Sequence, residues 1–268
     1  MKLGFIGMGA MGSAIASGAL QAGFIKAADL FFTDGAPGKN RLATEFGATQ
    51  LADNEQLLEK VDAVLIAVKP KHIGSVLAEV KPLLGNKLLI SIAGGVPLAS
   101  LEGDLKSGAR VIRVMPNINA LVGASMSAVC AGENAIEADK EFVLDLFNSV
   151  GHAIELEETL FGAFTALAGC APAWAFTFVE ALAKAGVAAG LTKTQAVESA
   201  TQMLLGSALM LQDGLSKGQH PGQLVDAVSS PGGSTIAGLL AGEDAGFSAA
   251  VVRMVEGAMA QDAKAAKS

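Results

Sequence analysis

Apolar residues in the first part of the chain gather in short unbroken runs instead of alternating with polar ones. The runs lie at residues 2–6, 30–33, 63–68, 88–92 and 110–114. Stretches with helical spacing separate them, so the pattern predicts parallel strands joined by crossover helices. Strands that are apolar on both faces are typical of a sheet that helices cover on both sides. We therefore expect an α/β sheet in this part of the chain.

The second part of the chain has a different period. Residues 125–132 and 151–157 can add one or two edge strands around a helix at residues 136–150, but the strand signal disappears after residue 157. Residues rich in Ala, Leu and Met then repeat with helical spacing. Breaks are expected at residues 169–173, 189–194, 215–223 and 229–235. The sequence thus predicts an α/β domain over residues 1–156 and an all-α domain over residues 157–268.

Helices in the second part are apolar on more than one face. Residues 196–211 carry almost no charged side chain except Glu198, and a helix that is apolar all round needs burial on both sides. One layer of helices cannot provide this, so we expect a second copy of the chain to cover them, in a homodimer or a higher homo-oligomer. Helix caps are expected at Thr192 or Thr194, and at Ser234 or Thr235.

One stretch, residues 159–179, carries no charge and is long enough to cross a bilayer. Gly169 to Pro172 interrupts this stretch, and Glu180 and Lys184 follow on one helical face. This arrangement favours a buried or oligomeric bundle over a lipid-facing helix. No membrane association is expected.

The first apolar run leads directly into a glycine-rich turn, with the sequence GFIGMGAMGSA at residues 4–14. A strand, GxGxxG and a helix in this order are typical of a dinucleotide-binding, Rossmann-like fold. Gly7 permits the tight turn, Gly9 lets a pyrophosphate approach the backbone, and Gly12 lets the helix pack close to the sheet. Amides at the helix start supply a positive pole for the phosphates. We therefore expect a doubly wound sheet that binds a dinucleotide.

Composition narrows the possible partners. The net charge is −7 and no basic stripe is present, which argues against binding to nucleic acid. Cys130 and Cys170 are too far apart for a CxxC metal pair and form no disulfide framework, so neither a metal site nor an oxidising compartment is expected. The amino end lacks the pattern of an export signal. These features favour the cytoplasm.

In a parallel sheet the reaction takes place at the carboxyl ends of the strands, so the loops after the apolar runs form the candidate site. Lys69 and Pro70 follow one strand, and Pro70 ends that strand and exposes backbone to a cofactor ribose, or Lys69 is only a solvated charge beside a turn. Gly94 and Gly95 allow close approach of a nicotinamide ring, or form a flexible turn. Asn117 in the MPNIN loop can donate to substrate or cofactor, or serve only as a turn residue.

Asp34 lies at the end of the second apolar run, 22 residues after Gly12. A carboxylate there accepts hydrogen bonds from an adenosine ribose, which favours NADH, and it repels the 2′-phosphate of NADPH unless it turns away. Lys39 and Arg41 can compensate that charge, but they stand further along the chain. NADP and NAD therefore both remain candidate cofactors.

The acids in the chain bear on the reaction type. A ketone reductase must donate a proton to the developing alkoxide, yet the chain has no tyrosine, which excludes the Tyr/Lys arrangement of short-chain dehydrogenases. The histidines, His72, His152 and His220, are expected to be surface residues. An iminium substrate removes the need for such an acid, because its nitrogen already carries a proton.

Near the carboxyl end, SSPGGST at residues 229–235 leads into IAGLLAG, the pattern of a glycine-rich loop that opens a helix. The bare amides from Gly232 to Thr235 can hold a carboxylate. The hydroxyls of Ser230, Ser234 and Thr235 can add hydrogen bonds. The alternative is a helix cap without a ligand.

Along nearly its whole length the chain resembles the pyrroline-5-carboxylate reductase family. The motifs that carry the resemblance are GFIGMGAMGSAI at the amino end, AVKP at residues 67–70, RVIRVMPN at 110–117 and HPGQLVDAVSSPGGSTIAGL at 220–239. The resemblance implies reduction of Δ1-pyrroline-5-carboxylate, a cyclic imino acid, to L-proline in the last step of proline synthesis. It also implies a dinucleotide domain followed by a helical domain that interlocks in a dimer, with larger rings of dimers common.

The resemblance also implies roles for individual residues. The pyrophosphate turn matches Ile6, Gly7, Met8, Gly9, Ala10 and Met11, and the adenosine end matches Asn54. Backbone that touches the cofactor matches Ala67, Val68, Lys69 and Pro70, and also Ile92, Ala93 and Gly94. The loop that holds the substrate carboxylate matches Gly233, Ser234 and Thr235, with Thr235 beside the ring nitrogen as the catalytic residue.

Two segments depart from the family pattern. GCAPAW at residues 169–174 stands where GSGPAY is usual, and MPNIN at 115–119 stands where MPNTP is usual. Both departures bear on substrate preference and turnover more than on the fold. Two other functions are alternatives. A β-hydroxyacid dehydrogenase has a similar amino end but usually carries a lysine in GxxGxGxxxK, which is missing here at the comparable place, and a non-catalytic dinucleotide sensor needs no second carboxylate site.

Overall fold

The computed structural model describes residues 1–34 and 41–265. It contains two compact units, one formed by Met1–Gly169 with the chain from Ala258 onward, and the other by Cys170–Gly257. The domain boundary predicted after residue 156 differs from the division between these units. It coincides instead with the change from strands to helices, since the last strand ends at Glu155.

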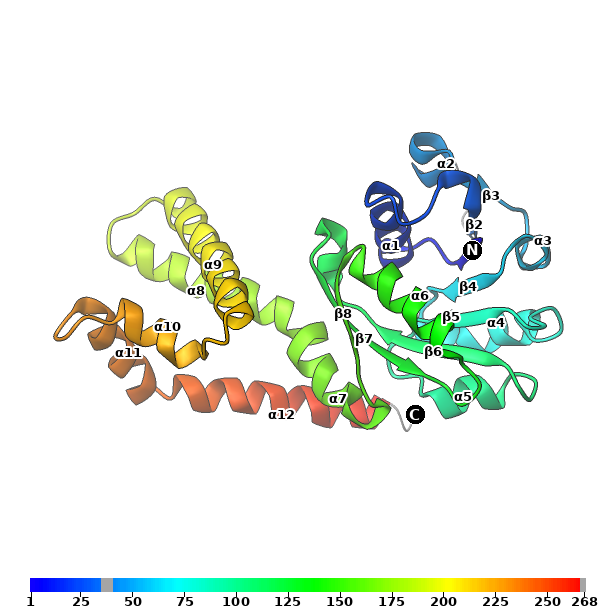
Figure 1. The fold of residues 1–268 in the computed structure, drawn as a ribbon. Helices are drawn as coiled ribbons and strands as arrows, with labels where there is room; N and C mark the ends of the chain where they lie inside the picture. The colour runs from blue at the N-terminus through cyan, green and yellow to red at the C-terminus, as the bar shows by residue number, and fades with distance from the viewer. Residues whose placement is uncertain (35–40, 266–268) are drawn as a thin grey trace. The chain divides into compact units, whose positions relative to one another are not determined.

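A twisted eight-stranded sheet forms the centre of the first unit (Figure 1). The strands are β1 (Leu3–Ile6), β2 (Leu30–Thr33), β3 (Thr49–Gln50), β4 (Ala63–Ile66), β5 (Leu88–Ser91), β6 (Arg110–Met115), β7 (Ser125–Ala131) and β8 (Gly151–Glu155). Their order is β3-β2-β1-β4-β5-β6-β7-β8, and within the described residues every neighbouring pair is parallel except β6 and β7. The strand order reverses between β1 and β4, which is where open α/β sheets bind their ligands.

Helices cover both faces of this sheet. They are α1 (Ala10–Gln21), α2 (Arg41–Phe46), α3 (Asn54–Lys60), α4 (Ile73–Val80), α5 (Leu98–Gly103) and α6 (Glu137–Asn148). One core cluster joins α1 and α6 to the sheet through Ile15, Phe147 and Phe5. A second cluster joins α3, α4 and α5 to the sheet, for example through Leu77 and Val64. Two separate cores on one sheet confirm the predicted doubly wound, Rossmann-like arrangement.

The apolar runs of the sequence correspond closely to the strands. β1, β2, β4, β5 and β6 each begin and end within two residues of a predicted run, and β7, β8 and α6 confirm the predicted edge strands and the helix between them. The reason is burial on both faces, since every residue of β1, β4 and β5 is buried. The short β3 was not predicted because Thr49 and Gln50 are polar and exposed.

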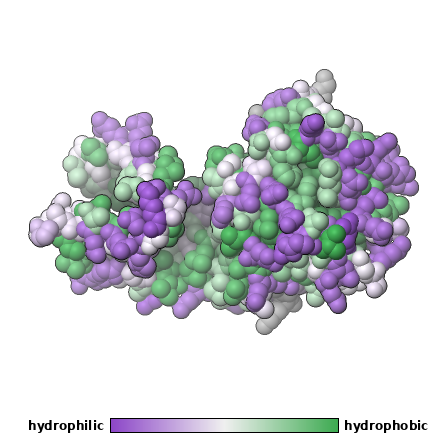
Figure 2. Space-filling model, in the orientation of Figure 1, coloured by the Kyte–Doolittle hydropathy of each residue, from purple (hydrophilic) through white to green (hydrophobic). Residues whose placement is uncertain are grey.

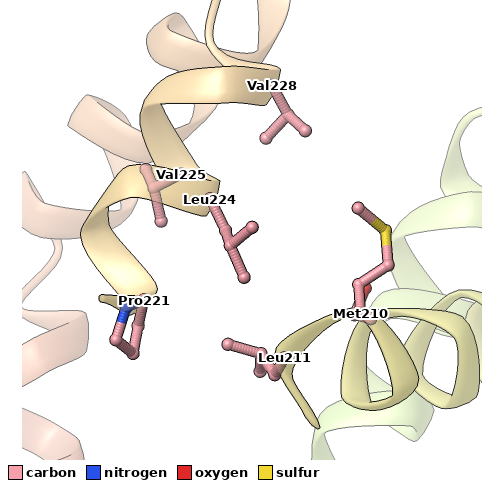
Figure 3. Close-up of a pocket in the computed structure, with 7 residues that line it drawn as sticks. Met210, Leu211, Pro221, Leu224, Val225 and Val228 are labelled. Atoms are coloured by element: carbon pink, nitrogen blue, oxygen red, sulfur yellow. The ribbon is translucent and has the colours of Figure 1, made fainter. Parts of the chain in front are cut away.

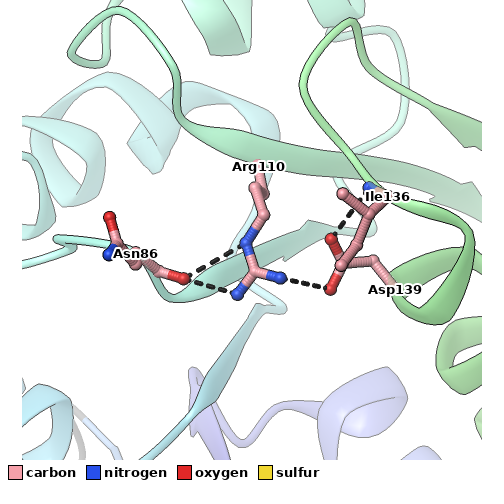
Figure 4. A network of polar contacts seen from close by, with 4 residues as sticks. All are labelled: Asn86, Arg110, Ile136 and Asp139. Atoms are coloured by element: carbon pink, nitrogen blue, oxygen red, sulfur yellow. Dashed lines mark hydrogen bonds and ion pairs between the residues drawn. The ribbon is translucent and has the colours of Figure 1, made fainter.

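An ion pair between a half-buried arginine and a buried aspartate joins α6 to β6 (Figure 4). Arg110 at the start of β6 donates from Nη1 to Oδ1 of Asp139 over 2.8 Å, and the Asp139 side chain is only 2% exposed. Nε and Nη2 of Arg110 donate to the carbonyl oxygen of Asn86. Oδ2 of Asp139 accepts from the backbone N–H of Ile136 at the start of α6. The two charges are therefore paired and hydrogen-bonded, as burial requires.

A continuous helical run follows the sheet. It consists of a 3₁₀ turn (Glu158–Leu160), α7 (Phe161–Phe164), a π-helical turn (Thr165–Cys170) and α8 (Ala171–Ala188). The break predicted at residues 169–173 is therefore wrong. Pro172 stands in the first turn of α8, where its missing N–H is tolerated, and the helix continues through the wider π turn.

By length and composition alone, this run, Glu158–Ala188, is apolar enough to cross a membrane. It nevertheless carries a charge network at its end. The carboxylate of Glu180 lies 3.8 Å from Nζ of Lys184 and 2.6 Å from Nζ of Lys193. The first of these pairs is the predicted i, i+4 pair, and lipid-facing positions rarely hold such charges.

The remaining helices are α9 (Lys193–Ser216), α10 (Pro221–Val228), α11 (Ser234–Asp244) and α12 (Phe247–Ala265). Thr192 caps α9 as predicted, because its Oγ1 accepts from the N–H of Gln195. The cap predicted for α11 at Ser234 or Thr235 is wrong, since Gly233 is the N-cap and both hydroxyl residues lie within the helix.

The chain bends sharply between its last two helices. An angle of 52° separates α11 from α12, at a break that the sequence analysis did not predict and where Gly246 has φ +82°. A glycine reaches this left-handed conformation without strain, so the chain can change direction there.

The single tryptophan of the chain, Trp174, lies in the first turns of α8. It therefore belongs to the second unit.

Candidate functional site

Three glycines shape the turn between β1 and α1. Gly7 has φ +94°, a left-handed value that favours glycine, and its amide donates to the carbonyl oxygen of Thr33. A Cβ on Gly12 would collide with the carbonyl oxygen of Gly7 and would lie 3.1 Å from Cβ of Ala67. A Cβ on Gly9 would meet no heavy atom within 4 Å. The turn is therefore tight at Gly7 and Gly12 and open at Gly9, as a dinucleotide motif requires.

The first turn of α1 presents backbone donors at this opening. Gly9 is the N-cap in an extended conformation and supplies no side-chain cap, so the first amides lack an acceptor within the helix. The hydroxyl of Ser13 donates to the carbonyl oxygen of Met8 over 2.9 Å, which ties the turn to the helix. No acidic side chain stands in the first turn of α1. Its positive pole is consequently available to an anion.

The carboxyl end of β2 contacts the start of α3. The Thr33 hydroxyl donates to Oδ1 of Asn54 over 2.7 Å, and Nδ2 of Asn54 donates to Oε2 of Glu79 over 2.7 Å. The carboxamide of Asn54 is thus fixed in orientation, with one N–H left to donate. Asp34 is half-buried and directly follows Thr33. The groups predicted to compensate its charge, Lys39 and the Arg41 side chain, lie outside the described part of the structure.

The ends of β4 and β5 continue the same edge of the sheet. The amide of Ala67 donates to the carbonyl oxygen of Ile6 over 2.8 Å, and the amide of Ile92 donates to that of Ile66 over 3.2 Å. The predicted cofactor residues in the two loops are Ala67, Val68, Lys69, Pro70, Ile92, Ala93 and Gly94. A Cβ on Gly94 would meet no heavy atom within 4 Å. The predicted residues after β1, β2, β4 and β5 are thus brought together at one edge.

At the far end of the β5–α5 loop lies a charged cluster that the sequence analysis did not single out. Oε1 of Glu158 accepts from the backbone N–H of Leu98, the first residue of α5, over 2.6 Å and from Nη1 of Arg113 over 2.7 Å. The guanidinium of Arg113 lies 4.6 Å from the centre of the Phe161 ring, a cation–π contact. The sequence signal that could have pointed to this cluster is Arg113, a charged residue in the middle of the apolar run at residues 110–114.

Asn117 joins the β6–β7 connection to the π turn. Its Oδ1 accepts from the N–H groups of Asn119 and Met126 over 3.2 and 3.3 Å, and its Nδ2 donates to the carbonyl oxygen of Ala168 over 2.9 Å. The residue is only 7% exposed. One N–H of the carboxamide is left. A cofactor role for Asn117 stays a prediction and would depend on that single donor.

In the second unit, residues 229–235 form a turn that opens α11. The amide of Gly233 donates to the carbonyl oxygen of Ser230 over 3.0 Å, and Gly232 has φ +68°. Proline followed by a left-handed glycine at the central positions is typical of a type II turn. Pro231 and Gly232 occupy those positions, so the SSPGGST sequence is explained by the turn that it forms.

The start of α11 offers donors without a cap. Gly233 supplies no side-chain cap and no acidic residue stands in the first turn. Ser234 and Thr235 are exposed, and Oγ of Ser229 is buried without a hydrogen-bond partner. Free amides beside hydroxyl groups form a donor set that fits a carboxylate.

The helices of the second unit expose many apolar side chains (Figure 2). A hollow of about 310 Å³ lies between α9 and α10 (Figure 3). It is lined by Ser207, Met210, Leu211, Pro221, Leu224, Val225 and Val228. Met210, Leu209 and Val228 are each more than half exposed. An apolar surface of this kind marks an interaction site.

The histidines lie at the surface. His72, His152 and His220 are exposed, as predicted. His220 also caps α10, since its Nδ1 accepts from the N–H of Gly222 over 3.1 Å, a role that the sequence analysis missed. Within residues 1–34 and 41–265, no group of His, Cys, Asp and Glu side chains could hold a metal ion.

Cys130 and Cys170 are free and half-buried. Burial raises the pKa of the Cys130 thiol, and the nearby charge of Glu158 raises it further. A raised pKa favours the protonated thiol, which is a poorer nucleophile than the thiolate.

Known proteins match this chain along its length. The family described as pyrroline-5-carboxylate reductase dimerisation matches residues 158–265, and the family described as NADP oxidoreductase, coenzyme F420-dependent, matches residues 2–95. A pyrroline-5-carboxylate reductase of Methanosarcina acetivorans is 40% identical over 256 residues, covering 95% of this chain and 94% of that protein. One of Escherichia coli is 36% identical over 269 residues, covering 100% and 99%.

Solved structures that resemble this chain belong to the same family as these relatives. Plasmodium falciparum pyrroline carboxylate reductase with NADP bound has a TM-score of 0.87 and 36% identity, over 99% of this chain and 98% of that one. A pyrroline-5-carboxylate reductase of Coxiella burnetii has a TM-score of 0.93 and 29% identity, over 98% of each chain.

Proposed function

The chain belongs to the pyrroline-5-carboxylate reductase family, and on this basis we propose how its own residues perform the reaction. It is an NAD(P)H-dependent oxidoreductase that reduces Δ1-pyrroline-5-carboxylate to L-proline, the final step of proline biosynthesis. Its substrate is a small molecule, and the match of residues 158–265 to a dimerisation family supports a homo-oligomer.

The cofactor, in this proposal, lies along the carboxyl edge of the sheet. Its pyrophosphate takes the opening at Gly9 and the first amides of α1, its adenosine end lies at Asp34 and Asn54, and its nicotinamide end lies at the loops that follow β4 and β5. Support comes from the reversal of strand order beside β1 and from the uncovered backbone at Gly9 and Gly94. When bound, the reduced dinucleotide supplies the hydride.

The substrate carboxylate is proposed to bind at the start of α11. Amides of the first turn and the hydroxyls of that segment donate to it, with the roles shared among Ser230, Gly232, Gly233, Ser234 and Thr235. The observation that carries this assignment is the start of α11 itself, which has no side-chain cap and no acidic residue. A helix start in this state favours an anion.

Thr235 is proposed as the catalytic residue. As the imine carbon is reduced, the ring nitrogen changes from a protonated, delocalised iminium to an amine with a lone pair. A hydroxyl that donates to this nitrogen stabilises the change, and no stronger acid is required. The absence of tyrosine from the chain is consistent with such chemistry.

The assignment is tested by steady-state kinetics with Δ1-pyrroline-5-carboxylate and both NADH and NADPH. Proline-stimulated reduction of NAD(P)⁺ at high pH is the matching reverse assay. A reductase gives both activities. A β-hydroxyacid dehydrogenase instead oxidises hydroxy acids, and a dinucleotide sensor binds cofactor without turnover, so either result would contradict the proposed mechanism.

The oligomer is proposed to interlock through the helices of the second unit. Exposed apolar side chains on α8 to α12 support this arrangement, together with the hollow between α9 and α10. Burying such surface against a second copy removes it from water.

Light scattering on the purified chain is expected to give at least twice the monomer mass of 27.0 kDa at micromolar concentration. The physical reason is the apolar helical surface, which a single copy leaves in contact with water. A monomer mass under these conditions would contradict the prediction.

Asp34→Ser is expected to lower the Michaelis constant for NADPH about 3- to 10-fold relative to NADH, the effect of about 1 kcal/mol from one partly exposed charge. The matched control is Asp29→Ser, which removes the same charge just before β2 begins. The measurement is the ratio of the two Michaelis constants. An unchanged ratio would mean that Asp34 points elsewhere and that Asn54 or Arg41 sets the preference.

We also propose the cytoplasm as the compartment. The free state of Cys130 and Cys170 suits reducing conditions.

A further inference from the structure

We propose that Glu158 and Arg113 are positioning residues. They hold the backbone of the β5–α5 loop in the position in which the nicotinamide ring can transfer its hydride. The inference rests on the proposed function, because that loop is assigned there to the nicotinamide end of the cofactor. Neither residue touches the substrate or cofactor in this proposal, since both act through the backbone of the loop.

The loop between Ile92 and Pro97 is held locally by two long hydrogen bonds, from the N–H of Val96 to the carbonyl oxygen of Ala93 over 3.4 Å and from the N–H of Ala93 to Oγ of Ser91 over 3.3 Å. Gly94 and Gly95 carry no side chains, and Gly95 has φ +75°. At its near end, the loop is tied to the sheet by the Ile92 amide, which donates to the carbonyl oxygen of Ile66 over 3.2 Å. At its far end, the position of the backbone depends on the place where α5 begins.

That place is set by Glu158. Its Oε1 accepts from the N–H of Leu98 over 2.6 Å, and Leu98 is the first residue of α5 and 7% exposed. The carboxylate thereby occupies an orphan donor at a helix start, where a negative charge is favourable. Pro97 is the N-cap and offers no side-chain cap of its own.

Arg113 fixes the carboxylate in turn. Its Nη1 donates to the same Oε1 over 2.7 Å, with side chains exposed by 11% for Arg113 and 30% for Glu158. The guanidinium is held by the ring of Phe161, which is 2% exposed. A charge-assisted bond in a partly desolvated place is stronger and more directional than a surface pair. Arg113 of β6 and the N–H of Leu98 therefore bind the same oxygen atom, Oε1 of Glu158, which connects β6 to the end of the loop.

Glu158→Gln is the informative variant, because it keeps the size and an acceptor oxygen but removes the charge. We expect kcat to fall about 5- to 20-fold while the cofactor dissociation constant changes less than about twofold, since a small displacement of a reacting group slows chemistry more than binding. The primary deuterium isotope effect, measured with cofactor deuterated at the transferred hydrogen, should rise as the hydride step becomes slower. Glu157→Gln is the matched control, because Glu157 is exposed and directly precedes Glu158 in the chain.

Several results separate the possibilities. A purely structural role would lower the fraction of folded enzyme and the melting temperature, and it would leave the isotope effect unchanged. Glu158→Gln with the kcat and isotope effect of Glu157→Gln would overturn the proposal. An inactive wild-type enzyme would instead contradict the proposed function, so the two failures are distinguishable. Glu158→Asp, which restores the charge, should recover part of the lost rate.

Cys130 supplies a readout that does not depend on turnover. Its thiol pKa is raised by burial first and by the charge of Glu158 second, while the backbone N–H of Glu158 and then the charge of Arg113 lower it, and the charge of Glu155 adds a smaller increase. Glu158→Gln should therefore lower the pKa and speed alkylation at a fixed pH, and Arg113→Met should do the opposite. Both are measured in a Cys170→Ser background. Equal alkylation rates in all three proteins would mean that the carboxylate is not held beside β6 and β7.

Discussion

Replacing Thr235 with valine is expected to lower kcat/KM for Δ1-pyrroline-5-carboxylate about 10- to 150-fold, with cofactor binding unchanged. Valine keeps the shape of threonine and removes one hydrogen-bond donor. The loss corresponds to one charge-assisted hydrogen bond of roughly 1.5 to 3 kcal/mol. Thr235 is exposed in the first turn of α11, so folding should not depend on it. The measurement is steady-state kinetics together with a cofactor titration.

Thr235→Ser is the control, because it restores the hydroxyl without the methyl group and should recover most of the activity. Wild-type turnover in the valine variant would remove Thr235 from the mechanism. An equal loss of cofactor affinity would show that the loop before α11 binds the dinucleotide instead of the substrate.

Alanine at the glycines of the first turn is expected to separate folding from cofactor binding. Gly12→Ala places a Cβ against the carbonyl oxygen of Gly7, and because both are fixed by backbone, the turn itself must shift. Such overpacking costs about 1–3 kcal/mol. Thermal unfolding should occur several degrees lower, and cofactor affinity should fall by about 100-fold or more because the phosphate opening is deformed.

Gly9→Ala should behave differently, since a Cβ there meets no heavy atom within 4 Å. The protein is expected to melt like the wild type while binding cofactor about 10- to 100-fold more weakly, because the new methyl group occupies the path of the pyrophosphate. Gly74→Ala in α4 is the matched control, since its Cβ is also unobstructed, and it should gain about 0.5–1 kcal/mol of helix stability with normal binding. Normal cofactor binding in Gly9→Ala would place the pyrophosphate elsewhere.

The strands were predictable because a strand that is buried on both faces consists of an unbroken run of apolar residues. Every residue of β1 is buried, so apolar identity alone finds the strand. The capping box of α9 was equally local, since Thr192 and Gln195 stand three residues apart. Where neighbours in the chain decide the structure, the sequence pattern suffices.

Other features depend on contacts that local patterns do not record. Glu158 forms an ion pair with Arg113, which lies 45 residues away in the chain. Neither the residue types nor their spacing predicts that pair. The start of α11 was misjudged for a related reason. A turn through Pro231 and Gly232 moves the helix start to Gly233, so the hydroxyl residues expected to cap the helix are left with free side chains.

The candidate site divides in the same way. The reasons given for Gly7 and Gly12 hold in the structure, because Gly7 has a left-handed φ and a Cβ on Gly12 would have no clearance, whereas the role of Gly9 at the pyrophosphate stays a prediction. Asn117 was predicted to be either a donor to a ligand or a turn residue, and its Oδ1 does cap the following turn by accepting from the N–H of Asn119. Its Nδ2 also donates to the carbonyl oxygen of Ala168 in the π turn, which the sequence did not indicate. That bond ends at Ala168, the residue just before the GCAPAW segment, and no local pattern in the sequence predicts it.

Trp174 gives one of the two units an optical label of its own. The chain has one tryptophan and no tyrosine, and Trp174 belongs to the unit Cys170–Gly257. Tryptophan fluorescence therefore originates in the unit Cys170–Gly257, whereas a reduced nicotinamide bound at the proposed cofactor site would emit from the unit that holds the sheet. One heating experiment, read in two emission bands, can thus follow the melting of the helices and the release of the cofactor as separate events, without any dye or added reporter residue.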